Sequence, residues 1–263
     1  HIREQKRTKR KYINKIVDND GITLTTQDEI REEIRMYFKQ LYSATGQTPH
    51  NQSFSSITQE MLQIEDLGHN LTPDELKQAI DTCPRNKSPG EDGLPVEFYD
   101  KFWNILSKEI TLVLNDIIVQ PTIPSDFANG IIVLIPKIPK PSQIQDYRPI
   151  TLLNSDYKIF MRCLKRRLAP HTDTILGGQQ QAVRKEGNIL NVLSAIRDSI
   201  SESQISNSGK MILSLDFDHA FDRVSHDYLF HTMQRFGIDV ALINIIKKIF
   251  AIATTKILIN GRL

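Results

Sequence analysis

Two aspartates, Asp216 and Asp218, follow an apolar segment in the second half of the chain. Alternation over residues 211–218 predicts a strand that brings both carboxylates to the same face. The apolar side chains expected on its buried face are Leu213, Leu215 and Phe217. Paired carboxylates are hard oxygen ligands of the kind that Mg²⁺ binds, with phosphates and water completing its shell. Acids at a strand end also cap turns and helices, so the pattern alone leaves both roles open.

A two-metal phosphoryl transfer needs more carboxylates close to such a pair, to hold both ions against the attacking and leaving oxygens. Asp222 and Asp227 follow within the next few residues. We expect Asp222 to lie in or beside the next helix and to serve as a structural hydrogen-bond acceptor. The acid set that this segment predicts is therefore incomplete.

Helix-start signals mark two of the elements expected to frame the site. Thr26 with Glu29, and Thr72 with Glu75, each have the spacing of a capping box. Apolar residues at helical spacing then predict a core-facing helix up to residue 41, and a second helix that ends before Pro84.

Other periodic segments complete the expected elements. Apolar spacing over residues 96–119 predicts one long buried helix, and the apolar run 131–135 predicts a strand. Further helices are expected over 152–168, 188–205, 226–235 and 239–250, and further strands over 211–217 and 255–259. The mixed order of helices and strands favours an α+β, palm-like sheet over a doubly wound one.

Basic residues gather in two places. The expected 152–168 helix carries five bases without an acid between positions 158 and 167. We predict that its polar side contacts nucleic acid through Lys158, Arg162, Lys165 and Arg166. The basic arm at residues 1–16 could lie along phosphates or could be a solvated terminus.

Residues 43–70 are polar and weakly periodic, which suggests a linker and a division into 1–70 and 71–263.

Composition bounds the class of protein without identifying it. Lys and Arg number 33 against 31 Asp and Glu, so the net charge does not decide the partner. Cys83 and Cys163 are the two cysteines, a number that supports neither a disulfide framework nor a zinc site and fits a reducing compartment. The longest strongly apolar run is too short to cross a bilayer, so we expect a soluble protein without a membrane partner. Asn260-Gly261 predicts a hairpin whose returning strand would follow Leu263, and we therefore expect a longer parent chain.

Four blocks of sequence occur in an order that resembles one family. They are Ser88-Pro89-Gly90-Glu91-Asp92-Gly93 with Glu97-Phe98-Tyr99, Leu134-Ile135-Pro136-Lys137, Tyr147-Arg148-Pro149-Ile150-Thr151-Leu152-Leu153, and Leu215-Asp216-Phe217-Asp218-His219-Ala220-Phe221-Asp222-Arg223-Val224. Together they resemble the reverse transcriptases of non-LTR (LINE-type) retrotransposons over residues 72–263. The resemblance implies fingers and an incomplete palm, mostly helical with a small incomplete antiparallel sheet. It also implies an RNA-directed DNA polymerase of the nucleus and cytoplasm.

The resemblance implies roles by position. Asp216 matches the first catalytic aspartate and metal ligand, with the backbone carbonyl of Phe217 beside it, and the metal implied is Mg²⁺ or Mn²⁺. Phe221 matches the residue that screens the sugar of the incoming deoxynucleoside triphosphate. Lys137 and Arg148 match residues that hold its triphosphate, which suits a mobile ammonium and a forked guanidinium. The implied partners are an RNA template and a DNA primer, and the oligomeric state stays open.

The sequence departs from the family in two places. Gln180 begins a Gln-x-Gly-Phe block, but Ala182 and Val183 replace the glycine and the aromatic. The turn that carries the other two catalytic aspartates would lie beyond Leu263. We therefore expect the isolated chain not to polymerise DNA.

Two other functions remain as alternatives. A decayed element could retain RNA binding without catalysis, and salt-dependent binding without nucleotide incorporation would select it. An apolar strand ending in Asp-x-Asp is also typical of glycosyltransferases, but that class predicts a nucleotide-binding βαβ unit upstream. The segments before residue 211 are chiefly helical and basic, which disfavours this second alternative.

Overall fold

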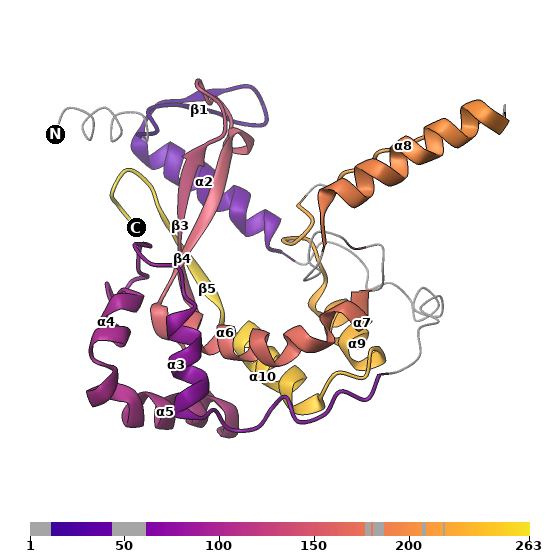
Figure 1. The fold of residues 1–263 in the computed structure, drawn as a ribbon. Helices are drawn as coiled ribbons and strands as arrows, with labels where there is room; N and C mark the ends of the chain where they lie inside the picture. The colour runs from indigo at the N-terminus through magenta and orange to yellow at the C-terminus, as the bar shows by residue number, and fades with distance from the viewer. Residues whose placement is uncertain (1–11, 44–61, 177–179, 181–186, 207–208, 218) are drawn as a thin grey trace.

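A computed structural model of the chain describes residues 12–43, 62–176, 180, 187–206, 209–217 and 219–263. The α-helices are α2 (Gln27–Leu41), α3 (Pro73–Asp81), α4 (Val96–Lys101), α5 (Trp103–Val119), α6 (Ser155–Leu168), α7 (Thr172–Leu176), α8 (Ile189–Ser206), α9 (His226–Arg235) and α10 (Val240–Ile252). The strands are β1 (Ile16–Val17), β2 (Thr23–Leu24), β3 (Asn129–Pro136), β4 (Tyr147–Leu153) and β5 (Thr254–Leu258), and the 3₁₀ turns are η2 (Ile144–Asp146) and η3 (Ala169–His171). Figure 1 shows the sheet beside α2, with the other helices gathered below and α8 projecting to one side.

The main sheet has the order β4-β3-β5. β3 and β4 are antiparallel, whereas β3 and β5 run parallel. The α+β class is confirmed, but the expectation of an antiparallel sheet is wrong for β5. Alternation along a single strand does not reveal the direction of its neighbour, so the sequence pattern could not predict this pairing.

One hydrophobic core lies between α2 and the sheet. Ile30, Ile34 and Phe38 of α2 pack on Ile132 and Leu134 of β3. The capping box expected at Thr26 is present: Glu29 donates its backbone N–H to Thr26, and its carboxylate accepts the backbone N–H of Thr26. Together the cap and the apolar stripe fix where this helix begins and which side it buries.

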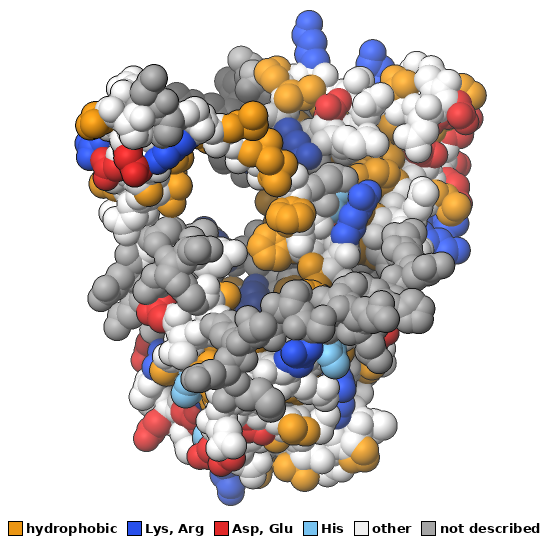
Figure 2. Space-filling view, turned by 90° about the vertical axis from the view of Figure 1, so that its right-hand side faces the viewer, with side chains coloured by type: hydrophobic (Ala, Val, Ile, Leu, Met, Phe, Trp, Pro, Cys, Tyr) orange, Lys and Arg blue, Asp and Glu red, His pale blue; other side chains and the backbone are white. Residues whose placement is uncertain are grey.

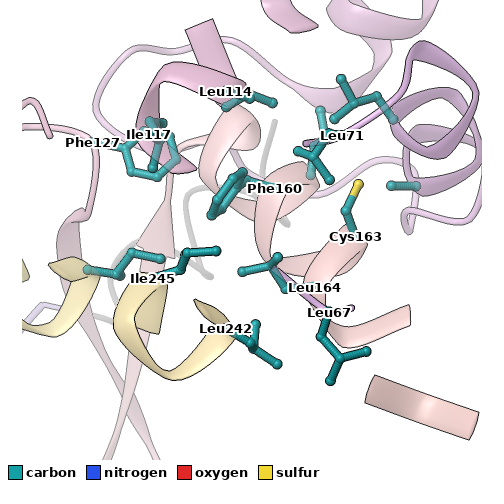
Figure 3. Close-up of a cluster of buried hydrophobic side chains, with 14 of the residues drawn as sticks. Leu67, Leu71, Leu114, Ile117, Phe127, Phe160, Cys163, Leu164, Leu242 and Ile245 are labelled. Atoms are coloured by element: carbon teal, nitrogen blue, oxygen red, sulfur yellow. The ribbon is translucent and has the colours of Figure 1, made fainter. Parts of the chain in front are cut away.

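A second core joins the remaining helices. Phe160 of α6 is fully buried at its centre, with Leu114 and Ile117 of α5 and Leu242 and Ile245 of α10 around it (Figure 3). α3 begins with the expected capping box between Thr72 and Glu75 and adds its own apolar face to this core.

Three expectations about elements are wrong. The helix expected over 96–119 is broken at Phe102, whose φ of −101° and ψ of 14° end α4 and begin α5. No Gly or Pro marks this break, and Ile105 and Val113, which were expected to be buried, are 74% and 59% exposed. β4 was not predicted as a strand, and it takes the first residues of the expected 152–168 helix.

The third correction concerns residues 211–217, which do not form a strand. Leu213, Leu215 and Phe217 were expected on a buried face, but they are 74%, 78% and 81% exposed. Within the part of the chain that the structure describes, no strand lies beside this segment to pair with its backbone. An extended segment without such a neighbour cannot form a ladder of hydrogen bonds.

Residues 62–70, at the end of the expected linker, are attached to the turn between α9 and α10. Ile64 donates its backbone N–H to Gly237, and Asp239 accepts the backbone N–H groups of Leu67 and Gly68. Gly237 has a φ of +69°, and a Cβ atom there would lie 1.3 Å from the carbonyl oxygen of Leu62. Residues 44–61 of the expected linker and the arm at 1–11 lie outside the described residues. The division at residue 70 stays a prediction.

Candidate active site

The β3–β4 hairpin positions Lys137 and Arg148. Arg148 lies opposite Ile135 in the register, and Lys137 follows β3 and continues the same pairing, since its backbone N–H donates to Asp146 at 2.7 Å. Cross-strand partners and alternate residues share a face of a sheet. Both cations therefore lie on one face at the same end of the hairpin, and both are exposed.

The loop that joins the two strands is held by Asp146. The Asp146 carboxylate accepts the backbone N–H groups of Ser142 and Gln143 at 2.8 and 3.0 Å. These backbone hydrogen bonds keep the pKa of Asp146 below its ordinary value. The Lys137 amine donates to the carbonyl of Gln145 at 2.8 Å. These hydrogen bonds thus fix the backbone of the loop that joins Lys137 to Arg148.

The loop at residues 88–93 packs against the start of α6. Gly93 has a φ of +71°, and a Cβ on Gly90 would lie 2.4 Å from the backbone nitrogen of Asn154. The Ser155 hydroxyl donates to the carbonyl of Leu94 at 2.7 Å. Glu91 also pairs with Lys256 of β5. The close approach at Gly90 and the positive φ at Gly93 therefore favour glycine at both positions for reasons of the fold itself.

Asp216 and Phe221 lie in the exposed segment and turn that precede α9. Asp216 is exposed and makes no hydrogen bond or ion pair within the described part of the chain, and the Phe221 side chain is 93% exposed. Asp222 lies in the turn before α9, where its carboxylate faces Nδ1 of His219 at 3.4 Å. This agrees with the structural role expected for Asp222. Asp218, the second acid of the pair, lies outside the described residues.

Exposed apolar side chains surround the Asp216 segment. Met211 and Ile212 line a groove with Val192, Ile196 and Ile200 of α8. The expected helix here is confirmed, yet no residue of α8 is buried. Figure 2 looks onto the side from which α8 projects, and hydrophobic side chains are visible on that surface among Lys and Arg. The segment carrying Asp216 thus lies on an incompletely covered apolar surface.

The basic residues of α6 are largely used by the fold. The Arg162 guanidinium donates to the hydroxyl and carbonyl of Thr82, and Arg166 donates to Gln78 at 2.6 Å. Lys158 is within 3.5 Å of the carbonyl of Ser88, whereas Lys165 is exposed. The predicted nucleic-acid contact of this helix stays a prediction, and these contacts show that Arg162 and Arg166 also join α6 to α3.

Sequence reasoning missed the neighbouring Arg167, whose side chain is 7% exposed. It binds both carboxylate oxygens of Glu75 and the carbonyl oxygens of Leu67, His69 and Asn70. The sequence signal that could have indicated a buried Arg167 is its position at the end of the basic run, beside the apolar residue Leu168. Glu75 had been assigned only as a helix cap.

The potential donor atoms at Asp216 and Phe217 are of the type that a divalent metal such as Mg²⁺ binds. Its carboxylate and the carbonyl of Phe217 are both oxygen ligands. Among the described residues there is no group of three or more His, Cys, Asp or Glu side chains that could hold a metal ion. The metal role of Asp216 and the Phe217 carbonyl therefore stays a prediction. No helix of the described residues has the length and apolar character needed to span a membrane.

One similarity to known proteins covers both β4 and the Asp216 segment. Residues 138–262 match the reverse transcriptase (RNA-dependent DNA polymerase) family. The matched residues are thus similar to that family over a little less than half of the chain. The match includes Arg148, Asp216 and Phe221, and it favours a reverse transcriptase over the glycosyltransferase alternative. Reverse transcriptases are nucleotidyltransferases that use a divalent metal, a nucleic-acid template and deoxynucleoside triphosphates.

Similarity to relatives extends over nearly the whole chain. The chain is 29% identical over 265 residues to the Transposon TX1 uncharacterized 149 kDa protein of Xenopus laevis, covering 99% of the chain and 20% of that protein. It is 25% identical over 195 residues to the Pol polyprotein of the type-1 retrotransposable element R2 of Nasonia vitripennis, covering 74% of the chain and 18% of that protein. It is 27% identical over 168 residues to the RNA-directed DNA polymerase of the mobile element jockey of Drosophila melanogaster, covering 63% and 18%. These names confirm the resemblance to non-LTR retrotransposon reverse transcriptases, and the chain spans about a fifth of such proteins.

Proposed function

We propose that this chain provides the fingers and the first part of the palm of an RNA-directed DNA polymerase of a non-LTR retrotransposon. It would act as part of a longer protein, on an RNA template and a DNA primer, in the nucleus and the cytoplasm. The observation that carries the proposal is the register of the β3–β4 hairpin, in which Lys137 and Arg148 share one face. Arg148 lies within the region that matches the family, and Lys137 directly precedes that region. A triphosphate is the ligand that a guanidinium fork and an ammonium at such a place suit best.

In this function each residue has one task. Arg148 would bind phosphate oxygens through its fork, and Lys137 would add a point charge beside it. The ring of Phe221 would lie against the sugar of the incoming nucleotide and disfavour a 2′-hydroxyl. Lys165, with Lys158, Arg162 and Arg166, would lie along the nucleic-acid backbone.

Asp216 and the carbonyl of Phe217 would hold Mg²⁺, or Mn²⁺ in its place. When bound, the metal neutralises the charge that develops on the phosphoryl group during transfer. Asp216 keeps its carboxylate exposed and free of ion pairs with other described residues, so its oxygens are available as ligands. The matched region contains a second exposed-loop acid, Asp222, whose contact with His219 distinguishes it from Asp216.

The test is primer extension on a primed RNA template with Mg²⁺, using a longer protein that contains this chain. Asp216→Asn should reduce incorporation by roughly a thousandfold, because metal stabilisation of the transition state is worth several kcal/mol. Asp222→Asn is the matched control and should retain most of the activity. Full activity of the Asp216→Asn protein would contradict the proposal.

The same assay separates the remaining alternative. We expect the chain of 263 residues alone to give no extension. If the longer protein also gives none but binds RNA in a salt-dependent manner, the non-catalytic RNA-binding remnant is the better description.

A further inference from the structure

One oxygen atom closes the loop between β3 and β4. The Oδ2 atom of Asp146 accepts the backbone N–H groups of Ser142 and Gln143 at 2.8 and 3.0 Å, and the Ser142 hydroxyl lies 3.4 Å from the same atom. The backbone N–H of Asp146 also donates to the carbonyl of Gln143 at 3.1 Å. The shape of the loop therefore depends on a single side chain.

Asp146 lies between the two cations of the hairpin. Its carbonyl oxygen accepts the backbone N–H of Lys137 at 2.7 Å, and Arg148 follows it by two residues. The Lys137 amine donates to the carbonyl of the neighbouring Gln145 at 2.8 Å. A displacement of the Asp146 backbone would therefore move both cations.

Both cations remain available to a ligand. The Arg148 side chain makes no hydrogen bond or ion pair with another described residue, and the Lys137 ammonium has two N–H donors besides the one bonded to Gln145. The Asp146 carboxylate is directed to backbone N–H groups rather than to either cation. It shapes the site without forming an ion pair there.

The rest of the loop is anchored independently of this carboxylate. Ile144 and Tyr147 are each 5% exposed and belong to the core between α2 and the sheet. Val17 of β1 donates its backbone N–H to the carbonyl of Ser142 at 2.7 Å. Loss of the Asp146 carboxylate should therefore loosen the loop while the sheet and its core remain folded.

We propose that Asp146 is a positioning residue for polyphosphate binding by this hairpin. It does not contact the ligand, and it sets the distance and direction of Lys137 and Arg148 through the loop. This role rests on the proposed function, in which those two cations hold the triphosphate of the incoming nucleotide. Because a single oxygen makes the contacts, the amide oxygen of asparagine can replace it, whereas alanine cannot.

The experiment measures binding of inorganic tripolyphosphate to the 263-residue chain by isothermal titration calorimetry. Arg148→Ala should raise the Kd about tenfold, because it removes the guanidinium fork. Asp146→Ala should raise it about fivefold, because the two cations are no longer preorganised, and Asp146→Asn less than about twofold. Asp18→Ala is the matched control and should bind normally. Asp18 accepts the backbone N–H groups of Asp20 and Ile22 in the turn between β1 and β2, away from both cations.

Two further measurements separate positioning from other roles. If Asp146 acts through the cations, Asp146→Ala should have a smaller effect once Arg148 is already alanine, so the two effects should not multiply. Urea unfolding establishes that each variant is folded. Hydrogen exchange of the Ser142 and Gln143 amides should be slow in the unsubstituted chain and in Asp146→Asn, which tests the hydrogen bonds without the alanine variant.

Each outcome decides the proposal. Weak binding by Asp146→Ala, near-normal binding by Asp146→Asn and a reduced effect in the Arg148→Ala background support it. Equal losses in the alanine and asparagine variants, multiplying effects, or fast exchange of both amides in the unsubstituted chain overturn it.

The Arg148 variant separates this proposal from the proposed function. Normal binding by Asp146→Ala together with weak binding by Arg148→Ala overturns the positioning role and leaves the proposed function in place. Normal binding by Arg148→Ala overturns the triphosphate site itself, and the positioning role with it.

Discussion

The side-chain amide of Asn260 makes the two hydrogen bonds to Ile13 that a neighbouring strand would make. Its Nδ2 donates to the carbonyl oxygen of Ile13 at 2.9 Å, and its Oδ1 accepts the backbone N–H of Ile13 at 2.8 Å. Asn260 also occupies the left-handed region of the hairpin turn after β5. One side chain therefore attaches the start of the described chain to its end.

Replacing Asn260 with Gly should separate these two roles. Gly accepts positive φ, so the turn is kept while the N–H of Ile13 loses its partner. We expect the free energy of unfolding to fall by about 1–2 kcal/mol. Asn86→Gly is the control, because Asn86 also has positive φ, and its backbone N–H, which glycine keeps, donates to the Glu97 carboxylate. Equal effects of the two substitutions in urea unfolding would show that the hydrogen bonds between Asn260 and Ile13 contribute nothing to stability.

Arg167→Met should be strongly destabilising. The guanidinium is 7% exposed and binds Glu75 and three carbonyl oxygens, so its removal leaves a half-buried carboxylate without its cation. The expected loss is about 3 kcal/mol in the free energy of unfolding. Arg166→Met is the control, since Arg166 is exposed and makes one bond to Gln78. A loss below that of the control would refute the structural role of Arg167.

Gly90→Ala should cost more stability than Gly93→Ala. A Cβ at Gly90 would meet the backbone of Leu153 and Asn154 at 2.6 and 2.4 Å, which forces the 88–93 loop away from α6. At Gly93 nothing lies within 4 Å, so the cost there is that of positive φ, about 1 kcal/mol. Thermal unfolding of both variants measures the difference. The opposite ranking would mean that the loop does not pack as described.

Asp156→Asn should stabilise the protein at neutral pH. Burial raises the pKa of Asp156, and the carboxylates of Asp92 and Asp126 raise it further, while the backbone N–H of Tyr157 lowers it. The folded state thus holds this proton to a higher pH than the unfolded state, and stability falls as pH rises from the ordinary value of 3.8 through the folded pKa.

The asparagine removes this penalty and still accepts the Tyr157 N–H bond. We expect its advantage in urea unfolding at pH 7 to vanish on acidification below the ordinary pKa. Glu109→Gln, at an exposed helical position, is the control. A constant advantage at all pH values would exclude ionisation of Asp156 as its source.

Arg148→Lys and Arg148→Ala should both raise the KM for deoxynucleoside triphosphates in the longer polymerase. Lysine keeps the charge and loses the fork, so its effect should be smaller than that of alanine, which we expect to be about tenfold or more. Steady-state kinetics on a primed RNA template measures both values. An unchanged KM in the alanine variant would remove Arg148 from the triphosphate site.

Local signals were the ones that predicted structure well. The capping boxes at Thr26 and Thr72 located the starts of α2 and α3, and both are present. The strand expected at 131–135 and the helices expected at 226–235 and 239–250 are confirmed as β3, α9 and α10. Each of these depends on neighbours within a few residues, which is the range that a sequence pattern covers.

Pairing over long distances was not predictable in the same way. The parallel partner of β3 comes from residues 254–258, and no local pattern indicates it. Residues 211–217 have the alternation of a strand, but alternation cannot supply the neighbour that a strand requires. For the site, the sequence located Lys137 and Arg148 on blocks that the structure brings together on one hairpin, while the metal role of Asp216 remains a prediction.

The position of β5 in the sheet has a consequence for synthesis on the ribosome. β3 can pair with β4 as soon as that strand emerges, because a short loop joins them. β5 follows roughly a hundred residues later. At about 5–20 residues per second, the edge of β3 that pairs with β5 therefore stays without a partner for roughly 5–20 s. During that interval the nascent β3 has an open edge of Ile, Val and Leu, the kind of strand that chaperones bind and that pairs with other nascent chains.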